Sequence, residues 1–164
     1  EDIYFYIINN AKKYLNITSP YILVDNHLQE DLIFAAARGV EVSIIVPALP
    51  DHLITFCIGK TFLETFVNKG IKVYLYQKGF IHAKTFISDN QIATVGSVNL
   101  DYRSLAHHYE DAVWMCGTPV INNIKEDFCT TIFKCREITP EFCRKRSFVK
   151  SLLIPILRLF APML

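Results

Sequence analysis

The feature that most constrains the fold is a short, largely apolar run, then a longer helical pattern, then a second strand-like segment. The apolar run, Val42–Val46, ends at Pro47, and the second segment is Ile71–Tyr76. Between them, Leu53–Asn68 has the length and composition of a helix. Apolar runs of this kind are typical of strands that are buried on both faces of a parallel sheet. The pattern therefore predicts a strand–helix–strand unit in an α/β protein.

The rest of the chain adds elements of both kinds. Asp25 or Asn26 is a suitable N-cap for one of the helices. Asp89 and Asn90 are turn residues that would join two strands as a hairpin. We expect helices at Ile3–Leu15, from residue 26 to Arg38, and at Val120–Lys134, and strands at Ile17–Ser19, Ala83–Ser88, Gln91–Val95 and Ala112–Cys116. The expected fold class is therefore α/β, a mixed and mostly parallel sheet flanked by helices.

Charge divides the chain into two parts. Residues 1–133 contain ten Lys and Arg against fourteen Asp and Glu, a net charge of −4, whereas residues 134–164 contain seven against two, a net charge of +5. An acidic body argues against a surface that coats nucleic acid, and a basic end allows attraction to an anionic membrane. We expect a catalytic part at residues 1–138 and a separate C-terminal segment at residues 139–164.

The last eighteen residues, Ser147–Leu164, are apolar but contain two cations and two prolines. Such a sequence makes a poor membrane-spanning helix. An amphipathic helix that lies in the membrane interface, with its cations reaching the head groups, fits better. The alternative is a C-terminal helix packed on the core of the domain, and the preceding basic residues favour membrane contact.

Five cysteines are present, and none of them forms a CxxC pair. An odd number without metal-ligand spacing favours a reducing compartment, with neither disulfides nor a zinc site. Cys57 and Cys116 lie in apolar runs and are expected to be buried thiols. We therefore expect no metal and no cofactor.

Chemistry concentrates around the predicted hairpin. His82 and Lys84 are two residues apart at the start of its first strand, so both side chains are expected on one face. Ser97 and Asn99 follow its second strand. Because paired antiparallel strands place the start of one beside the end of the other, we expect these four side chains to converge.

This set suits phosphoryl transfer. Lys84 and Asn99 are suited to hold the non-bridging oxygens of a phosphoryl group, and Ser97 adds a donor. His82 is suited either to attack phosphorus or to protonate a leaving oxygen. Glu110 is the expected hydrogen-bond acceptor behind His82. Asp89 also belongs to the motif, where it is more suited to hold the turn or Lys84 than to transfer a proton.

The pattern resembles the signature of the phospholipase D superfamily, HxK(x)4D followed by GSxN. Its flanks resemble the C-terminal half of bacterial cardiolipin synthases over nearly the whole chain. The similar segments are residues 18–21, 35–40, 42, 45–47, 51–52, 76–80, 99–104 and 158–164, and Glu110 lies where the family places a supporting acid.

The resemblance implies a phosphatidyltransferase that converts two phosphatidylglycerols to cardiolipin and glycerol, through a phospho-histidine and without a metal. It implies two catalytic histidines, so a second motif-bearing half comes from the same parent chain or from a dimer mate. His82 would be the general acid and base, and the isolated chain would be inactive. The implied setting is a bacterial cell membrane, with the catalytic part on the cytoplasmic side, anionic phospholipid as the partner and no nucleic acid.

Several alternatives stay open. The chain could be another phosphodiesterase of the superfamily, either a phospholipid hydrolase or a dimeric nuclease, or a regulatory half without catalysis. Arg103 and Tyr102 could contact the lipid head group, or Arg103 could pair with Asp101. The Asp51-His52 pair could contact the head group, or Asp51 could cap the next helix. The adjacent residues at 107 and 108 are histidines, but neighbours in a strand face opposite ways and make a poor metal pair.

Overall fold

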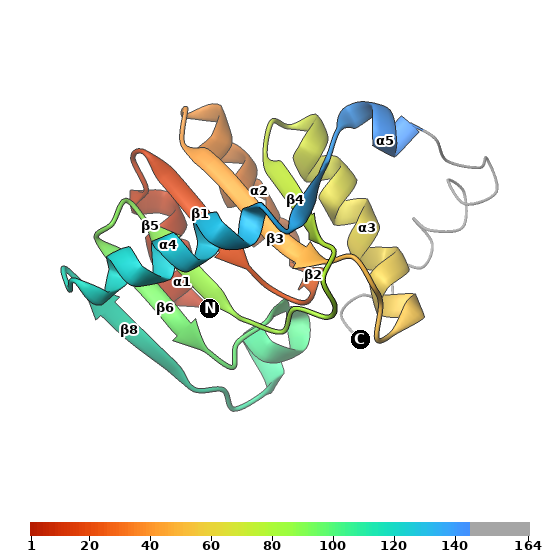
Figure 1. Ribbon diagram of the computed structural model, residues 1–164. Coiled ribbons are helices and arrows are strands. Elements are labelled where there is room, and N and C mark those ends of the chain that lie inside the picture. The colour runs from red at the N-terminus through yellow and green to blue at the C-terminus, as the bar shows by residue number, and fades with distance from the viewer. Residues whose placement is uncertain (145–164) are drawn as a thin grey trace.

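The computed structural model describes residues 1–144 and folds them around one large sheet (Figure 1). The helices are α1 (Asp2–Asn10), α2 (Asn26–Ala37), α3 (Leu53–Asn68), α4 (Val120–Ile132) and α5 (Pro140–Arg144), with a π-helical turn η1 (Arg103–His107). The strands are β1 (Tyr14–Thr18), β2 (Ile22–Leu23), β3 (Glu41–Pro47), β4 (Lys72–Tyr76), β5 (Thr85–Ser88), β6 (Ile92–Gly96), β7 (Leu100–Asp101), β8 (Ala112–Cys116) and β9 (Cys135–Ile138). The predicted membrane segment Ser147–Leu164 lies outside the described residues.

The large sheet has seven strands in the order β8-β6-β5-β1-β3-β4-β9. The β1–β3 and β3–β4 pairs are parallel, as the strand–helix–strand pattern predicted. The β1–β5, β5–β6, β6–β8 and β4–β9 pairs are antiparallel. The mixed α/β class is confirmed, but the expectation of a mostly parallel sheet is wrong. The short turn at Asp89 and Asn90 joins β5 to β6, so these two strands must pair antiparallel.

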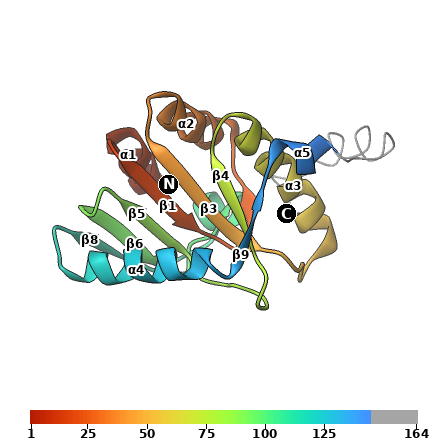
Figure 2. The same ribbon diagram turned by 45° about the horizontal axis from the view of Figure 1, so that its top comes forward.

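Helices cover both faces of this sheet, with α1, α2 and α3 on one face and α4 on the other (Figure 2). Ile44 of β3 packs in the cluster on the first face, and its neighbour Ile45 packs with Ile121 and Phe128 of α4 on the second. Both isoleucines have no exposed surface. Burying each stabilises the fold by about 1.5–3 kcal/mol. This two-sided burial accounts for the lack of alternation in the apolar run.

The first helix ends earlier than predicted. α1 stops at Asn10, so the helix expected to reach Leu15 is wrong, and the strand expected at Ile17–Ser19 begins earlier, at Tyr14. The carboxylate of Asp89 accepts hydrogen bonds from three successive backbone amides, those of residues 12, 13 and 14, at 2.7, 2.9 and 2.9 Å. Amides that are turned toward one carboxylate cannot donate along a helix, so this long-range contact ends it.

Three small features were not predicted. β9 adds a strand beside β4. α4 ends at Ile132, two residues earlier than expected, because the chain then turns into β9. β2 and β7 form a second, two-stranded parallel sheet next to the site. After β7, the chain forms the turn η1 instead of continuing extended.

β8 lies at the edge of the sheet, and its apolar side chains are largely exposed. Val113 is 62% exposed and Trp114 is 39% exposed. Cys116, at the end of β8, and Cys57, on α3, are also exposed, so the expectation that these thiols are buried is wrong. Apolar composition predicted the strand correctly, but the position of a strand within a sheet decides its burial.

Candidate functional site

The predicted hairpin is confirmed, and it brings the two halves of the motif together. Thr85 of β5 lies opposite Val95 of β6, and the amide of Gly96 donates to the carbonyl of Lys84 at 3.3 Å. His82 and Lys84 precede β5 instead of lying within it, so strand alternation does not fix their side chains. The residues before β5 and after β6 are nevertheless neighbours, as the sequence predicted.

Lys84 folds back along the chain toward its motif partner. Its Nζ donates to the carbonyl oxygen of His82 at 2.6 Å. Burial lowers the pKa of Lys84, and the carboxylates of Glu110 and Asp101 act in the opposite direction. The imidazole of His82 is exposed and lies near the ring of Phe80, with 5.7 Å between centroids. A partly desolvated ammonium and an accessible imidazole thus belong to residues two positions apart in the chain.

Ser97 is tied to the strand that follows the site. Its amide donates to the carbonyl of Asp111 at 2.8 Å, and its Oγ accepts from the Asp111 amide at 3.0 Å. This close approach requires Gly96, because a Cβ there would lie 2.1 Å from the carbonyl oxygen of Asp111. The glycine of the GSxN pattern therefore has a steric reason.

Glu110 is held by several donors. It accepts a hydrogen bond from the Ser97 hydroxyl, and its Oε1 lies 3.6 Å from Nδ1 of His108. Hydrogen bonding from Ser97 is the main cause that lowers the pKa of Glu110, and Ser104 and His108 lower it further. Within residues 1–144, no hydrogen bond or ion pair joins Glu110 to His82, so its support of that histidine stays a prediction.

The side-chain amide of Asn99 has a hydrogen-bond partner at its nitrogen but none at its oxygen. Its Nδ2 donates to Oγ of Ser104 at 3.2 Å, and Ser104 is itself fixed by its amide, which donates to Oδ1 of Asp101 at 2.7 Å. The Oδ1 of Asn99 is buried and has no hydrogen-bond partner among residues 1–144. An unpaired buried acceptor is a position where a bound molecule or another protein surface is expected to supply a donor.

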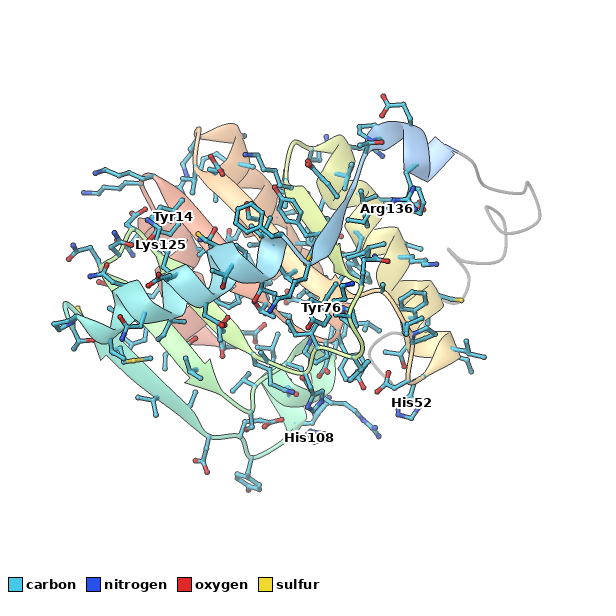
Figure 3. All side chains as sticks on the ribbon, viewed as in Figure 1. Tyr14, His52, Tyr76, His108, Lys125 and Arg136 are labelled. Carbon is cyan, nitrogen blue, oxygen red and sulfur yellow. The ribbon has the colours of Figure 1, made fainter. Side chains whose placement is uncertain are left out.

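Asn99, Asp101, Ser104 and His108 line a cavity of about 190 Å³, whereas His82, Lys84, Ser97 and Glu110 are not among its lining residues. Arg103, predicted to contact a head group, is exposed there beside Asn99. His52 and His108 come from distant segments and point toward the same end of the sheet (Figure 3). The full lining is Tyr21, Leu23, His52, Thr55, Asn99, Asp101, Arg103, Ser104 and His108. The cavity combines cationic, hydroxyl and amide groups, the donor set that suits a phosphate ester.

Some site residues were missed or misplaced by the sequence reading. Ser104 and His108 hold Asn99 and Glu110, and the spacing of Asp101 and Ser104, typical of a carboxylate that caps a turn, was the available signal. Asp89 lies at the turn of the hairpin, at the opposite end of β5 from Lys84. Its carboxylate is used by the three amides of the β1 entry, so the structure does not bring it to the site.

The open question on Asp51 and His52 is partly answered by geometry. The N-cap of α3 is His52, not Asp51, and its side chain makes no capping hydrogen bond. Asp51 accepts from the hydroxyl of Tyr21 and from the amide of His52.

Across residues 1–144, no helix is both long and apolar enough to cross a membrane.

Comparison with known proteins places this geometry in a family context. The family described as "Cardiolipin synthase, PLD-like domain" matches residues 4–132, which include all the motif residues. A Streptococcus mutans protein is 40% identical over 164 residues, which are 100% of this chain and 36% of that protein. A cardiolipin synthase of Clostridium perfringens is 38% identical over 161 residues, which are 98% of this chain and 34% of that enzyme. The chain thus spans about a third of the length of these relatives.

A solved structure supports the same fold. The phospholipase D family member Nuc from Salmonella typhimurium superposes with a TM-score of 0.74 at 20% sequence identity. The superposition covers 84% of this chain and 90% of Nuc. At this identity the likeness concerns the fold alone.

Proposed function

The chain belongs to the family of phospholipase-D-like domains of cardiolipin synthases, and from that membership we propose that it is the C-terminal catalytic half of a phosphatidyltransferase. The reaction converts two phosphatidylglycerols to cardiolipin and glycerol. Phosphatidylglycerol binds with its phosphodiester against Lys84 and its head group in the cavity beside Asn99 and Arg103.

The observation that carries this proposal is the convergence produced by one hairpin. The hydrogen bond between Gly96 and Lys84 places the His82–Lys84 segment beside Ser97, and Ser97 in turn holds Glu110. A cation, an accessible imidazole and hydroxyl and amide groups within one small region are the groups that a phosphoryl-transfer site requires.

The proposed chemistry divides one difficult displacement into two. First, a histidine nitrogen attacks phosphorus, a P–N bond forms, and the bond from phosphorus to the glycerol oxygen breaks as the second histidine protonates that oxygen. Then the second histidine removes the proton from the hydroxyl of an incoming phosphatidylglycerol. The new P–O bond forms as the P–N bond breaks. We assign the acid and base steps to His82, and its exposure gives both alcohols access.

The nucleophilic histidine must come from elsewhere. We propose that it is supplied by a second motif-bearing half, from the parent chain or from a dimer mate. Two features support this proposal: His82 is exposed, and the buried Oδ1 of Asn99 has no hydrogen-bond donor among residues 1–144. The exposed apolar edge of β8 is a further surface that suits cover by another protein surface.

The setting follows from the substrate. We propose that the protein acts at a bacterial cell membrane with this half on the cytoplasmic side, and that residues 139–164 associate with the membrane. The partner is anionic phospholipid. Nucleic acid is not proposed as a substrate, because residues 1–133 have a net charge of −4.

The proposal is tested by mass spectrometry of the lipids formed when the full-length protein is incubated with phosphatidylglycerol. Cardiolipin with an equal amount of glycerol is the expected result. Phosphatidic acid without cardiolipin would replace the transferase with a hydrolase. No product from phosphatidylglycerol, with cleavage of a supplied oligonucleotide, would replace it with a nuclease.

A further inference from the structure

Four large apolar side chains stand exposed at one end of the molecule. Leu49 lies in the loop after β3, Leu53 and Ile54 form the first turn of α3, and Phe80 lies in the loop between β4 and β5. They are 60%, 72%, 60% and 40% exposed, respectively. We call these four residues the apolar rim. Exposed apolar patches on soluble proteins mark contact surfaces when they are contiguous and bordered by polar residues.

The apolar rim lies at the mouth of the candidate site. Leu49 and Phe80 both line a narrow apolar cavity of about 30 Å³. That cavity shares Tyr21, Leu23 and Thr55 with the polar cavity that contains Asn99. The first turn of α3 and the loop before β5 lie at the end of the sheet where His52 and His108 are found (Figure 3). The apolar rim and the polar cavity are therefore adjacent parts of one surface.

Cations accompany the apolar rim. On α3, the Nζ of Lys60 lies 4.3 Å from the ring centroid of Phe56. Lys78 is exposed, two residues before Phe80. The nearby acid Asp51 is engaged by the Tyr21 hydroxyl. Apolar side chains bordered by cations are complementary to the acyl boundary and the anionic head groups of a phospholipid bilayer.

We propose that the apolar rim inserts into the interfacial layer of an anionic phospholipid bilayer and thereby sets the polar cavity at the level of the lipid phosphates. This inference rests on the proposed function for its substrate, but the insertion itself is a separate property of the surface. It differs from the predicted membrane contact of residues 139–164, because it involves the catalytic part itself.

Two other occupants of this surface are conceivable, the second half of the enzyme and residues 145–164. The bilayer is favoured by the cations Lys60 and Lys78, and by the position of the apolar rim beside the polar cavity that we propose binds the lipid head group. The experiment must therefore read the environment of the apolar rim itself, because other anchors could hold the protein on a vesicle.

Tryptophan fluorescence gives that local reading. Residues 1–164 contain one tryptophan, Trp114, so Trp114→Phe, combined with phenylalanine at any tryptophan elsewhere in the full-length protein, provides a silent background. In this background, Leu53→Trp places an indole on the apolar rim. Phe133→Trp is the matched control, because Phe133 is 89% exposed but follows α4 on the other face of the sheet. Vesicles of phosphatidylglycerol and phosphatidylcholine carry bromine at shallow acyl positions.

We expect at least twofold stronger bromine quenching of the Leu53→Trp indole than of the Phe133→Trp indole, with a blue shift that appears only when vesicles are added. Equal quenching at the two positions would overturn the proposal. A blue-shifted Leu53→Trp emission without vesicles, and without quenching when they are added, would instead assign the surface to a protein segment.

Turnover provides a second test in the full-length protein. The Leu53→Ser/Ile54→Ser variant is expected to lose at least tenfold in transfer with vesicle substrate, and to keep its rate with short-chain phosphatidylglycerol dispersed below its micelle concentration. Phe34→Ser/Phe133→Ser, with comparable exposure elsewhere, should retain both rates. Equal losses on both substrates would contradict insertion. If the unaltered protein transfers neither substrate, the proposed function fails, and the quenching still decides the role of the apolar rim.

Discussion

The hydroxyl of Ser97 donates a hydrogen bond to the carboxylate of Glu110, thirteen residues further along the chain. The same hydroxyl accepts from the amide of Asp111. Ser97 therefore joins the end of β6 to the entry of β8 and keeps Glu110 charged beside the cavity.

Ser97→Ala is expected to raise the pKa of Glu110 toward its ordinary value, because Ser97 is the main group that lowers it. A folded-state pKa below the unfolded value contributes stability above about pH 4.3, and that contribution disappears as the pH falls through the lowered folded value. Ser97 is exposed, so the loss at pH 7 should be roughly 1 kcal/mol. Urea unfolding at successive pH values below 7 checks this. A difference between Ser97→Ala and the unaltered protein that does not shrink in acid would contradict it.

Asp89→Ala is expected to destabilise the fold by about 2–3 kcal/mol, because three amides at the β1 entry lose their acceptor. The kcat of the folded fraction should be unchanged, since Asp89 lies away from the cavity. Asp89→Asn is the control, because asparagine tolerates the left-handed backbone found here (φ 56°) and keeps one acceptor. Urea unfolding and kcat are measured together. If Asp89→Ala lost kcat while its free energy of unfolding was unchanged, Asp89 would instead have a role in catalysis.

Gly96→Ala is expected to cost about 1–3 kcal/mol, because the new Cβ would overlap the carbonyl of Asp111 and push β6 and β8 apart. Gly59→Ala is the matched control. Its Cβ would meet only the carbonyl of Ile22 at 3.5 Å, and alanine favours the helix by up to about 1 kcal/mol. Thermal or urea unfolding of both variants checks the contrast, which fails if both glycines respond alike.

His82→Ala in the full-length protein is expected to lower kcat by at least about 10²-fold, since it removes a proton donor and acceptor. Its stability should change by no more than about 0.5 kcal/mol, because the side chain is exposed. His27→Ala, at another exposed histidine, serves as the control for both readings. Retained transferase activity in His82→Ala would exclude a catalytic role.

The alkaline limb of the pH profile tests Lys84. Burial lowers its pKa, so kcat/KM should fall at a pH below the free-lysine value of about 10.4 as the ammonium loses its proton. Lys84→Arg keeps the charge at all accessible pH values, and its profile should lack this fall even if its rate is lower. An identical alkaline limb in both proteins would assign the titration to another group.

The sequence by itself determined the local elements and the identity of the chemical groups. The apolar run at Val42–Val46 indicated a strand buried on both faces, because its only polar residue is Ser43 and polar residues do not recur at alternate positions. Asp89 and Asn90 indicated the hairpin, and the hairpin was sufficient to predict that His82 and Lys84 lie near Ser97. These inferences depend on short-range geometry, which residue type controls directly.

The tertiary structure decided what long-range contacts control. Asp89 ends α1 from a position more than seventy residues away, β8 becomes an exposed edge, and Glu110 turns to Ser97 and His108. Loops that are far apart in sequence bring the apolar rim beside the cavity. None of these outcomes follows from periodicity, because hydrogen-bond partners and burial depend on which segments become neighbours once the sheet has assembled.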